Sequence, residues 1–447
     1  MTHSTIWRER FRDGPLDPDF WLGTLDARLP ALFRAGLGTI LFIDALMTLP
    51  ELSDLFGSSG VWPARLASGP LAGLSDGMLL AAWLGGAAAL LAFALGLFAR
   101  VSAALGWLFL TAVHHRNPGI TTGGDYLAQI LLFFCVWQNT SGAFSLDARW
   151  FGKAREQVPA AAFRAMQVHL AVLYFVTARL KVRGGWLSGD GIYMSLQHLG
   201  FLRPPGALLL EHPALCKLLN FGVLGMEGAF LFFALCPIYA RKARWGAVFC
   251  GIAVQLGILM TMRVGSFTLL MLWICVLYLP AASGPRSDDA AERTRRGGVL
   301  AVCMTVVTLL EWSAFAGRRF PLPNAVARAQ ATLGLVQPFD LFGRTYSVDQ
   351  WYAHGKTAAG RDIDVLDSAA PGLRSVVGWR FATLYKLTFA TDTDYAVVGR
   401  WLCAKQAQAG EPLTSIVLGK RAREPVHPGE ERPFQAVDLF AGNCAAR

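Results

Sequence analysis

The feature that most constrains this chain is a series of long apolar segments between residues 29 and 316. About nine of them are long enough, or nearly so, to cross a lipid bilayer as helices. Their ranges are 29–49, 78–98, 100–114, 124–139, 163–181, 216–236, 243–262, 266–281 and 298–316. Backbone polar groups find no water inside a bilayer, so such segments must satisfy these groups within helices. The sequence therefore predicts an α-helical, multi-pass membrane protein.

The composition agrees with this fold class. Hydrophobic residues make up 54% of the 447 residues and charged residues only 16%, with a mean hydropathy of +0.40. The net charge of +10 comes largely from basic residues that flank apolar segments, so we expect no nucleic-acid partner. Residues 1–28 are polar and lack the short apolar core of a cleaved signal peptide, and we interpret them as a cytoplasmic tail.

The distribution of Lys and Arg predicts the orientation. With the N-terminus inside, the inner connections carry roughly three times as many basic residues as the outer ones. Nine crossings then place the end of the chain outside. We expect a protein of the plasma membrane, the inner membrane in bacteria, with a transmembrane domain at 29–317 and an extracytoplasmic domain at 318–447.

Residues 318–447 have the pattern of a soluble α+β domain. Residues 346–366 resemble two strands joined by a turn, 375–389 and 394–408 have helical spacing, and 413–419 are typical of a returning strand. Cys403 and Cys444 lie in this domain, where an oxidising compartment would allow a disulfide. The alternative is a pair of unbonded, buried thiols.

Candidate site residues gather on the fifth apolar segment. Gln167, Tyr174 and Lys181 are seven residues apart and share one helix face, which Thr177 widens. A polar stripe in a membrane helix should face protein or a wet cavity, because polar groups are costly in lipid. The alternative is that Lys181 marks the helix end and extends to the interface. An intramembrane lysine beside an apolar wall can serve as a base.

The predicted topology brings other ionisable residues to the same outer half of the membrane. His114 and His115 end the third segment, Asp125 begins the fourth, and Asp44 lies near the outer end of the first. We expect Lys181 and Asp125 to be catalytic, in a cavity lined by Gln167, Tyr174, Thr177, His114, His115, Asp44, Trp186 and Glu227. The alternatives are interfacial histidines, a helix cap at Asp125 and a neutral structural acid at Glu227. No metal-binding motif is present, and we predict no metal.

Several stretches resemble the horizontally transferred transmembrane (HTTM) domain family, which includes the vitamin K-dependent γ-glutamyl carboxylases. They are RAGLGTILFIDAL with FGSSGVWP, TTGGDYLAQILLFFCVWQNTSGAFSLDARW, and MQVHLAVLYFVTARLKVRGGWLSGDGIYMSL. The resemblance covers roughly residues 25–315, and VQPFDLFGRTYSVDQWYAHGKTAAGRDIDV resembles the segment that follows the membrane domain in bacterial members.

The resemblance implies a reduced quinone as cofactor and a role for Lys181. In the carboxylases, a lysine at the end of the matching helix supports deprotonation of reduced vitamin K. Oxygenation then creates a strong base that removes a glutamate γ-proton, and carbon dioxide adds. This chain departs from the carboxylases in three ways. Leu180 replaces their second lysine, a functional histidine of the animal enzymes falls near Gly124 and Asp125, and the large lumenal domain is much shorter.

Three functions are consistent with these features. The first is a membrane enzyme that uses a quinol, oxygen and Lys181 on a lipid or peptide substrate. The second is a non-catalytic maturation protein for a secreted peptide, like the family members that act in producing sporulation-delaying toxin. The third is a small-molecule transporter, which should show paired half-repeats that this sequence lacks. The sequence names no protein partner beyond membrane lipid and such a substrate.

Overall fold

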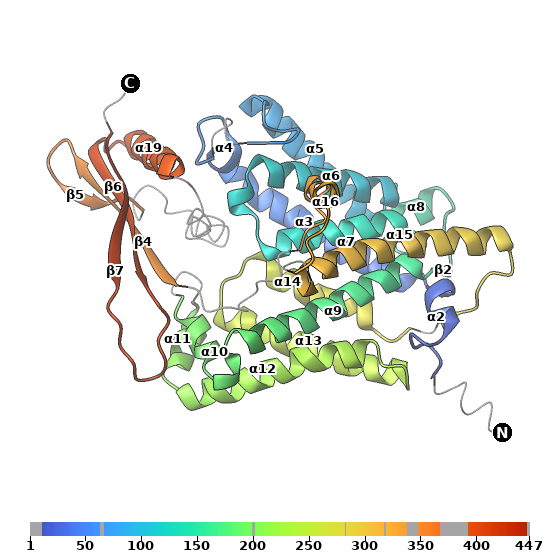
Figure 1. Cartoon of the computed structure of the whole chain (residues 1–447). Helices are drawn as coiled ribbons and strands as arrows, with labels where there is room; N and C mark the ends of the chain where they lie inside the picture. The colour runs from blue at the N-terminus through green and yellow to red at the C-terminus, as the bar shows by residue number, and fades with distance from the viewer. Residues whose placement is uncertain are drawn as a thin grey trace.

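The protein, described by a computed structural model, is a helical bundle with a small sheet domain at one end (Figure 1). The structure describes residues 11–62, 67–198, 202–281, 283–316, 319–337, 347–366 and 392–444. The bundle helices are α3 (Arg28–Thr48), α5 (Asp76–Leu95), α6 (Ala99–Arg116), α7 (Gly123–Trp137), α9 (Ala161–Arg183), α12 (Pro213–Ala234), α13 (Ala240–Thr261), α14 (Ser266–Ile274), extended by η5 (Cys275–Tyr278), and α15 (Ala290–Phe315). Each predicted apolar segment is thus helical.

Short elements connect the bundle helices. They are α2 (Pro18–Leu22), η1 (Leu49–Glu51), α4 (Leu52–Phe56), η3 (Pro118–Ile120), α8 (Leu146–Trp150), η4 (Trp186–Ser188), α10 (Gly191–Leu196) and α11 (Pro204–Leu210). Two further helices follow the bundle, α16 (Asn324–Thr332) and α19 (Asp392–Gln408). Local sequence sets several of these boundaries. Ser75 caps the start of α5 by accepting a hydrogen bond from the Met78 N–H, and Gly96 ends α5 in the left-handed conformation.

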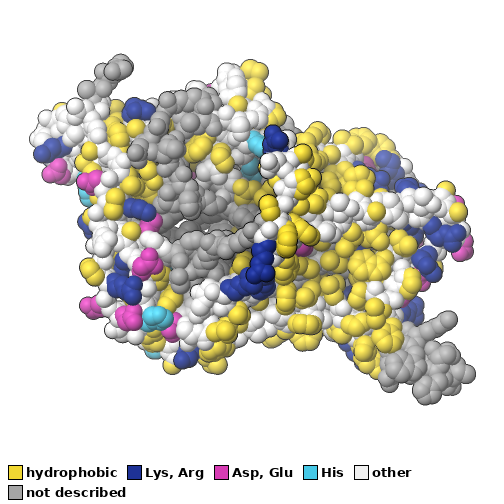
Figure 2. Space-filling view, in the orientation of Figure 1, with side chains coloured by type: hydrophobic (Ala, Val, Ile, Leu, Met, Phe, Trp, Pro, Cys, Tyr) yellow, Lys and Arg dark blue, Asp and Glu magenta, His cyan; other side chains and the backbone are white. Residues whose placement is uncertain are grey.

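Among the described residues, six helices are long and apolar enough to cross a membrane. They are α3 together with α4, α5, α9, α12, α13 and α15, whereas α7 and the α14–η5 unit are apolar but shorter. Hydrophobic side chains cover much of the bundle surface, and charged side chains gather toward its two ends (Figure 2). Phe232, Phe249 and Leu218 are each more than two-thirds exposed, as expected of side chains that face lipid. The chain is therefore a multi-pass membrane protein.

Helix α9 is the central element of the bundle. Its most apolar window is 83% buried, compared with 17% for α15 at the periphery. Helices α7, α12 and α15 all pack against it, so side chains on nearly every face of α9 meet protein rather than lipid.

One end of the bundle is closed by a small antiparallel sheet with the strand order β2-β1-β3. Its strands are β1 (Thr24–Asp26), β2 (Gln157–Pro159) and β3 (Ser283–Gly284). They join the N-terminal segment to the connections that precede α9 and α15. At the same end, the buried Arg164 guanidinium lies 4.2 Å from the Phe20 ring centroid, and its Nε donates to the Phe20 carbonyl at 3.2 Å.

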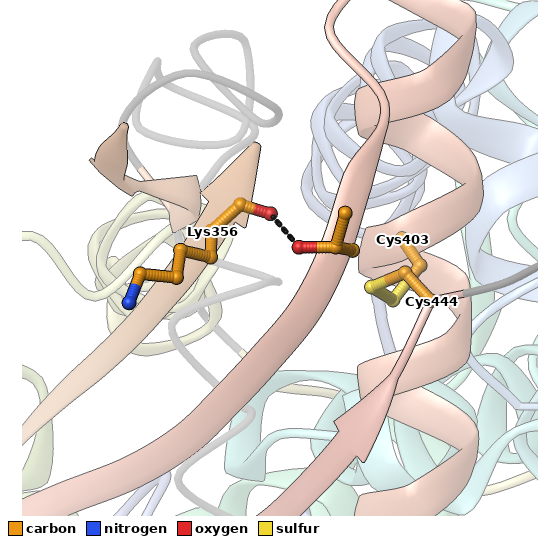
Figure 3. Close-up of a disulfide and its surroundings, with 4 residues drawn as sticks. Lys356, Cys403 and Cys444 are labelled. Atoms are coloured by element: carbon orange, nitrogen blue, oxygen red, sulfur yellow. Dashed lines mark hydrogen bonds between the residues drawn. A yellow bond between two sulfur atoms is a disulfide. The ribbon is translucent and has the colours of Figure 1, made fainter. Parts of the chain in front are cut away.

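The C-terminal domain is an antiparallel sheet with the order β5-β4-β6-β7, against which α19 packs. Its strands are β4 (Val348–Thr357), β5 (Asp362–Asp364), β6 (Leu413–Arg423) and β7 (Gln435–Asn443). Cys403 on α19 forms a disulfide with Cys444 at the end of β7, with their Cα atoms 5.5 Å apart (Figure 3). Beside it, Thr414 Oγ1 donates to the Lys356 carbonyl at 3.0 Å.

These elements correspond to the expected α+β pattern, with two differences, the additional strand β7 and the return of residues 324–337 to the bundle. Strand β7 follows a Pro- and Glu-containing stretch and was not predicted from the sequence. The predicted helical stretch 375–389 lies outside the described residues. Residues 324–337 return to the bundle, where Leu335 is buried and the Trp107 Nε1 donates to the Leu333 carbonyl at 3.0 Å.

The C-terminal domain contacts the bundle at the end opposite the small sheet (Figure 1). Lys405 Nζ lies 2.6 Å from Asp54 Oδ1, just after α3. After α9, His427 Nδ1 lies 2.7 Å from Asp190 Oδ2. Gln197 Nε2, also after α9, donates to the Val426 carbonyl at 2.7 Å. The connections that follow α3 and α9 thus share one end of the bundle with the C-terminal domain.

Candidate functional site

The polar stripe on α9 is buried inside the bundle. Gln167, Tyr174, Thr177 and Lys181 are between 2% and 6% exposed, and their neighbours come from α12, α13 and η5. Lys181 therefore does not extend into lipid or bulk water, although it lies in the last turn of its helix. The helical spacing that placed these residues on one face also decides which helices they meet.

Lys181 forms a buried ion pair with Glu227 of α12. The two side chains are 7% and 5% exposed, so each charge has lost nearly all contact with water. Thr177 Oγ1 lies 3.2 Å from the second carboxylate oxygen of Glu227 and 2.8 Å from the Tyr174 carbonyl, so its one proton is shared between these two acceptors. The Lys181 ammonium lies 5.1 Å from the Trp186 ring centroid. Such a pair is tolerated in an apolar interior only because each charge is matched by the other and by hydrogen bonds.

The loop after α9 places Trp186 over the ion pair. Gly185 and Gly189 bracket Trp186 and both have positive φ, 93° and 94°, which glycine adopts without strain. Asn220 on α12 is fully buried and donates through Nδ2 to the Trp186 carbonyl at 2.8 Å. Its Oδ1 accepts from the Ile192 N–H at 3.3 Å. Asn220 lies seven residues before Glu227, so one face of α12 holds both the loop and the carboxylate.

An aromatic and amide cluster lies deeper along the same stripe. The Tyr174 ring stacks on Phe230 with centroids 4.0 Å apart, and the Phe230 and Tyr278 rings are nearly perpendicular with centroids 5.0 Å apart. Gln255 Nε2 donates to the Tyr174 hydroxyl at 3.3 Å, and the Tyr278 hydroxyl donates to the Gln167 carbonyl at 2.6 Å. The site thus consists of a charged pair above a wall of rings.

Asp125 belongs to a different contact. Its Oδ2 accepts from the Thr122 N–H at 2.8 Å and the Thr122 hydroxyl at 2.7 Å, which makes a capping box at the start of α7. Asp125 Oδ1 lies 3.9 Å from His114 Nε2, and the His114 ring is 6.0 Å from Tyr126. Glu227, rather than Asp125, is therefore the acid that holds Lys181.

The other predicted site residues are spread over separate contacts. His115 Nε2 lies 3.2 Å from the Thr332 carbonyl, where residues after the bundle return to α6. Asp44 is half-buried on α3, and its carbonyl accepts from the Thr48 hydroxyl at 2.8 Å. The structure thus groups Gln167, Tyr174, Thr177, Lys181, Trp186 and Glu227 around α9 and α12, and it places His114 with Asp125 between α6 and α7. The catalytic roles of Lys181 and Asp125 remain predictions.

Comparison with known protein families identifies the family of this chain. The family model described as HTTM domain matches residues 24–282. This chain belongs to the HTTM domain family. The match spans more than half of the chain and includes the whole α9–α12 site of this HTTM protein. No curated protein and no solved structure matches it.

Sequence reasoning overlooked two residues of this HTTM protein that form a second buried pair. His169 Nδ1 lies 2.9 Å from Glu311 Oε1 on α15, with side-chain exposures of 0% and 12%. His169 is only two residues from Gln167, but this spacing points it away from the polar stripe. The sequence did show an ionisable side chain, His169, in the middle of an apolar segment, which is a sign of a functional or paired group. A single histidine does not indicate which residue it pairs with. Asn220 was also missed as the residue that fixes the Trp186 loop.

Proposed function

We propose that this HTTM protein is a membrane-embedded enzyme in which Lys181 and Glu227 together exchange a proton with a reduced quinone. The observation that carries the proposal is a buried ammonium–carboxylate pair beside an aromatic ring, on the helix whose motif resembles that of the carboxylases. Ionisable groups inside membrane domains are rare and commonly functional. The relationship to the carboxylases supports a reduced quinone as the substrate class, and Lys181 and Glu227 are the proposed proton-transfer group.

The direct contact determines how Lys181 can act as a base. A lysine whose ammonium is paired cannot accept a proton, so Glu227 must first hold the shared proton and leave a neutral amine. The proposed step therefore starts from the form in which both groups are uncharged inside a site that excludes water. Once Lys181 takes up a proton, its ammonium would lie next to the anion it has created and stabilise it. Thr177 holds the Glu227 carboxyl, and the Trp186 ring stabilises the cation.

The remaining chemistry is proposed by family resemblance. We propose that oxygen reacts with the deprotonated quinol and that the product acts on a lipid or a peptide. The C-terminal domain contacts the loop that carries Trp186, through Asp190 and Gln197, so a peptide bound by that domain would lie close to the site. Glutamate is one candidate side chain, and the replacement at Leu180 makes other acceptors equally compatible with the proposal.

We propose nine crossings, with the N-terminus in the cytoplasm and the C-terminal domain outside the inner membrane. The grouping of connections at two ends supports this proposal. The small sheet joins the N-terminus to the connections before α9 and α15, and the C-terminal domain contacts those after α3 and α9. An impermeant thiol reagent on intact cells should label an engineered cysteine at Asp362 but not one at Ser287. The reverse pattern would refute the orientation.

A second candidate is a non-catalytic maturation protein. The same Lys181–Glu227 contact favours it, because a fully matched ion pair can serve only to hold α9 against α12. In this case the pair fixes the helices and the outer domain binds a partner or peptide.

Activity measurements separate the two candidates. We would measure oxygen consumption with menadiol by the full chain in nanodiscs, using Lys181→Met, Glu227→Gln and the double variant. Lys217→Met on α12 is the matched control, since that lysine is exposed. The enzyme proposal expects activity in the wild type and the control and none in the double variant, even where its stability is normal. Full activity in the double variant would refute the role of the pair as a base.

A further inference from the structure

The second buried pair, His169 and Glu311, has polar atoms that no group among the described residues satisfies. His169 Nδ1 and Glu311 Oε1 are 2.9 Å apart, whereas His169 Nε2 and Glu311 Oε2 are buried and find no hydrogen-bond partner in the part of the chain that the structure describes. Leaving two such atoms unpaired in an apolar interior is costly, and native proteins rarely do so without a reason. We propose that this pair is a proton-accepting binding point for a lipid-soluble hydroquinone, separate from Lys181.

The carboxylate defines the chemistry of the histidine. With Glu311 ionised, His169 Nδ1 carries the proton that it shares with Oε1, so Nε2 is left with a free lone pair. This is the arrangement in which a carboxylate orients an imidazole as a general base and stabilises the imidazolium that forms. In the proposed step, the O–H bond of the ligand breaks, Nε2 gains the proton, and the oxygen keeps the electron pair. The product is a hydroquinone anion beside an imidazolium–carboxylate pair, with no redox change.

The acidity of the ligand's hydroxyl group and the aromatic rings around His169 together indicate the class of ligand. The reference pKa values are about 10 for a phenolic hydroxyl and about 6.5 for imidazole, so the proton moves to Nε2 only where the imidazolium is stabilised, which is the role that the proposal assigns to the Glu311 carboxylate. An imidazole takes a proton far less readily from an aliphatic alcohol, which resembles water at about 16. Aromatic rings line this region: the Phe134 ring lies 6.3 Å from that of His169, and Phe175 stacks with Phe315 at 6.4 Å. A flat ring with a hydroxyl group suits these neighbours.

Access to the pair is from the bilayer. Helix α15 is peripheral, Phe315 is 42% exposed, and the Glu311 side chain is 12% exposed, whereas His169 is fully buried. A ligand dissolved in lipid would therefore meet Phe315, then Glu311, and then His169 between α9 and α15. Arg179, farther along α9, lies 4.9 Å from the Phe315 ring and is the charged group that flanks this route.

The inference rests on the proposed function only for the quinol class of its ligand. The two pairs lie on different helix interfaces, since Glu227 belongs to α12 and Glu311 to α15. Twelve residues separate Lys181 from His169, about 18 Å along the helix axis, so one pair does not transfer a proton directly to the other.

The experiment measures bound hydroquinone anion rather than turnover. The full chain in nanodiscs is titrated anaerobically with menadiol, and the near-ultraviolet band of the anion is recorded at longer wavelength than that of menadiol. We expect this band in the wild type and in the Lys181→Met, Glu227→Gln double variant. We expect its loss in His169→Gln and in Glu311→Gln. His212→Gln, at an exposed histidine, is the matched control and should keep the band.

The outcomes separate the two proposals. A band that persists in His169→Gln, or that is absent from the wild type, overturns the inference. A band that disappears only in the double variant assigns the anion to Lys181. That result also overturns the inference about His169, while leaving the proposed function intact. If oxygen consumption is unaffected in the double variant but the band depends on His169, the proposed role of Lys181 fails and this inference stands. Thermal unfolding of each variant in the same nanodiscs shows that a lost band is not a lost fold.

Discussion

Replacing Lys181 and Glu227 one at a time and together is the most direct measure of what the buried pair contributes. Lys181→Met keeps an unbranched side chain of nearly the same length and removes the charge. Glu227→Gln keeps an acceptor for the Thr177 hydroxyl, which donates to the carboxylate at 3.2 Å. The double variant contains neither charge and nearly the same volume.

The structure sets the expected magnitudes. With side chains 7% and 5% exposed, either charge left alone has almost no solvent, and breaking such a pair costs about 3–5 kcal/mol of unfolding free energy. Lys181→Met also loses the contact with Trp186 at 5.1 Å, worth up to about 2 kcal/mol where water is excluded. The double variant should be within about 1 kcal/mol of the wild type, because replacing a whole buried pair is often neutral. The two single variants together should thus cost at least about 5 kcal/mol more than the double variant, and this difference is the coupling between the two sites.

The measurement is reversible unfolding in mixed micelles of dodecyl maltoside and SDS, followed by tryptophan fluorescence. Arg361 and Glu411 provide the matched control, because their 2.9 Å ion pair has side-chain exposures of 65% and 45%. Their coupling should stay below about 1 kcal/mol. If Lys181 and Glu227 also couple by less than about 1 kcal/mol, the two charges are hydrated in the native protein and the argument from burial is wrong.

Three further predictions concern parts of the fold outside this pair. Replacing Cys403 and Cys444 by Ser should cost the C-terminal domain about 4 kcal/mol, given a separation of 41 residues, and hydrogen exchange of that domain would show it. Thr122→Ala removes the cap of α7 and should cost about 1 kcal/mol in the micelle assay, whereas an unchanged value would contradict the cap. Burial and, next, the hydrogen bond to Asp438 raise the pKa of Tyr352 to about 12. Unfolded tyrosine titrates near 10, so stability should fall as the pH rises from about 10 through 12, and Tyr352→Phe should flatten that fall in thermal melts.

Much of the fold follows from hydropathy, because a spanning helix is specified mainly by its own residues. The nine predicted apolar segments are all helical, and their ends agree with the predicted boundaries within about three residues, except that α15 begins at Ala290 rather than at residue 298. The C-terminal sheet was harder to predict, since strands depend on partners distant in sequence. Strand β7 has mostly exposed residues and no clear alternation, and it is a strand because it pairs with β6 from Ser415 to Ala422.

The candidate site depends on helix packing that a single sequence does not predict. Helical spacing placed Gln167, Tyr174 and Lys181 on one face, and the structure keeps them on one buried face. Which acid meets that face depends on how α7 and α12 pack around α9, and nothing in the spacing encodes this. Asp125 caps the start of α7, a local role that depends only on neighbouring residues. The acid that pairs with Lys181 is Glu227, which another helix brings to the site.

The loop from Gly184 to Gln197 gives the candidate site a physical link to the C-terminal domain. Its first part holds the Trp186 ring near Lys181, and its later part contacts the C-terminal domain through Asp190 to His427 and Gln197 to Val426. Asn220 anchors both parts to α12 through the Trp186 carbonyl and the Ile192 N–H. A movement of the C-terminal domain would therefore displace the same segment that covers the ion pair. Under the proposed function, binding at the C-terminal domain and proton transfer at Lys181 would be coupled through this one short loop, which gives a physical reason for the two domains to share a chain.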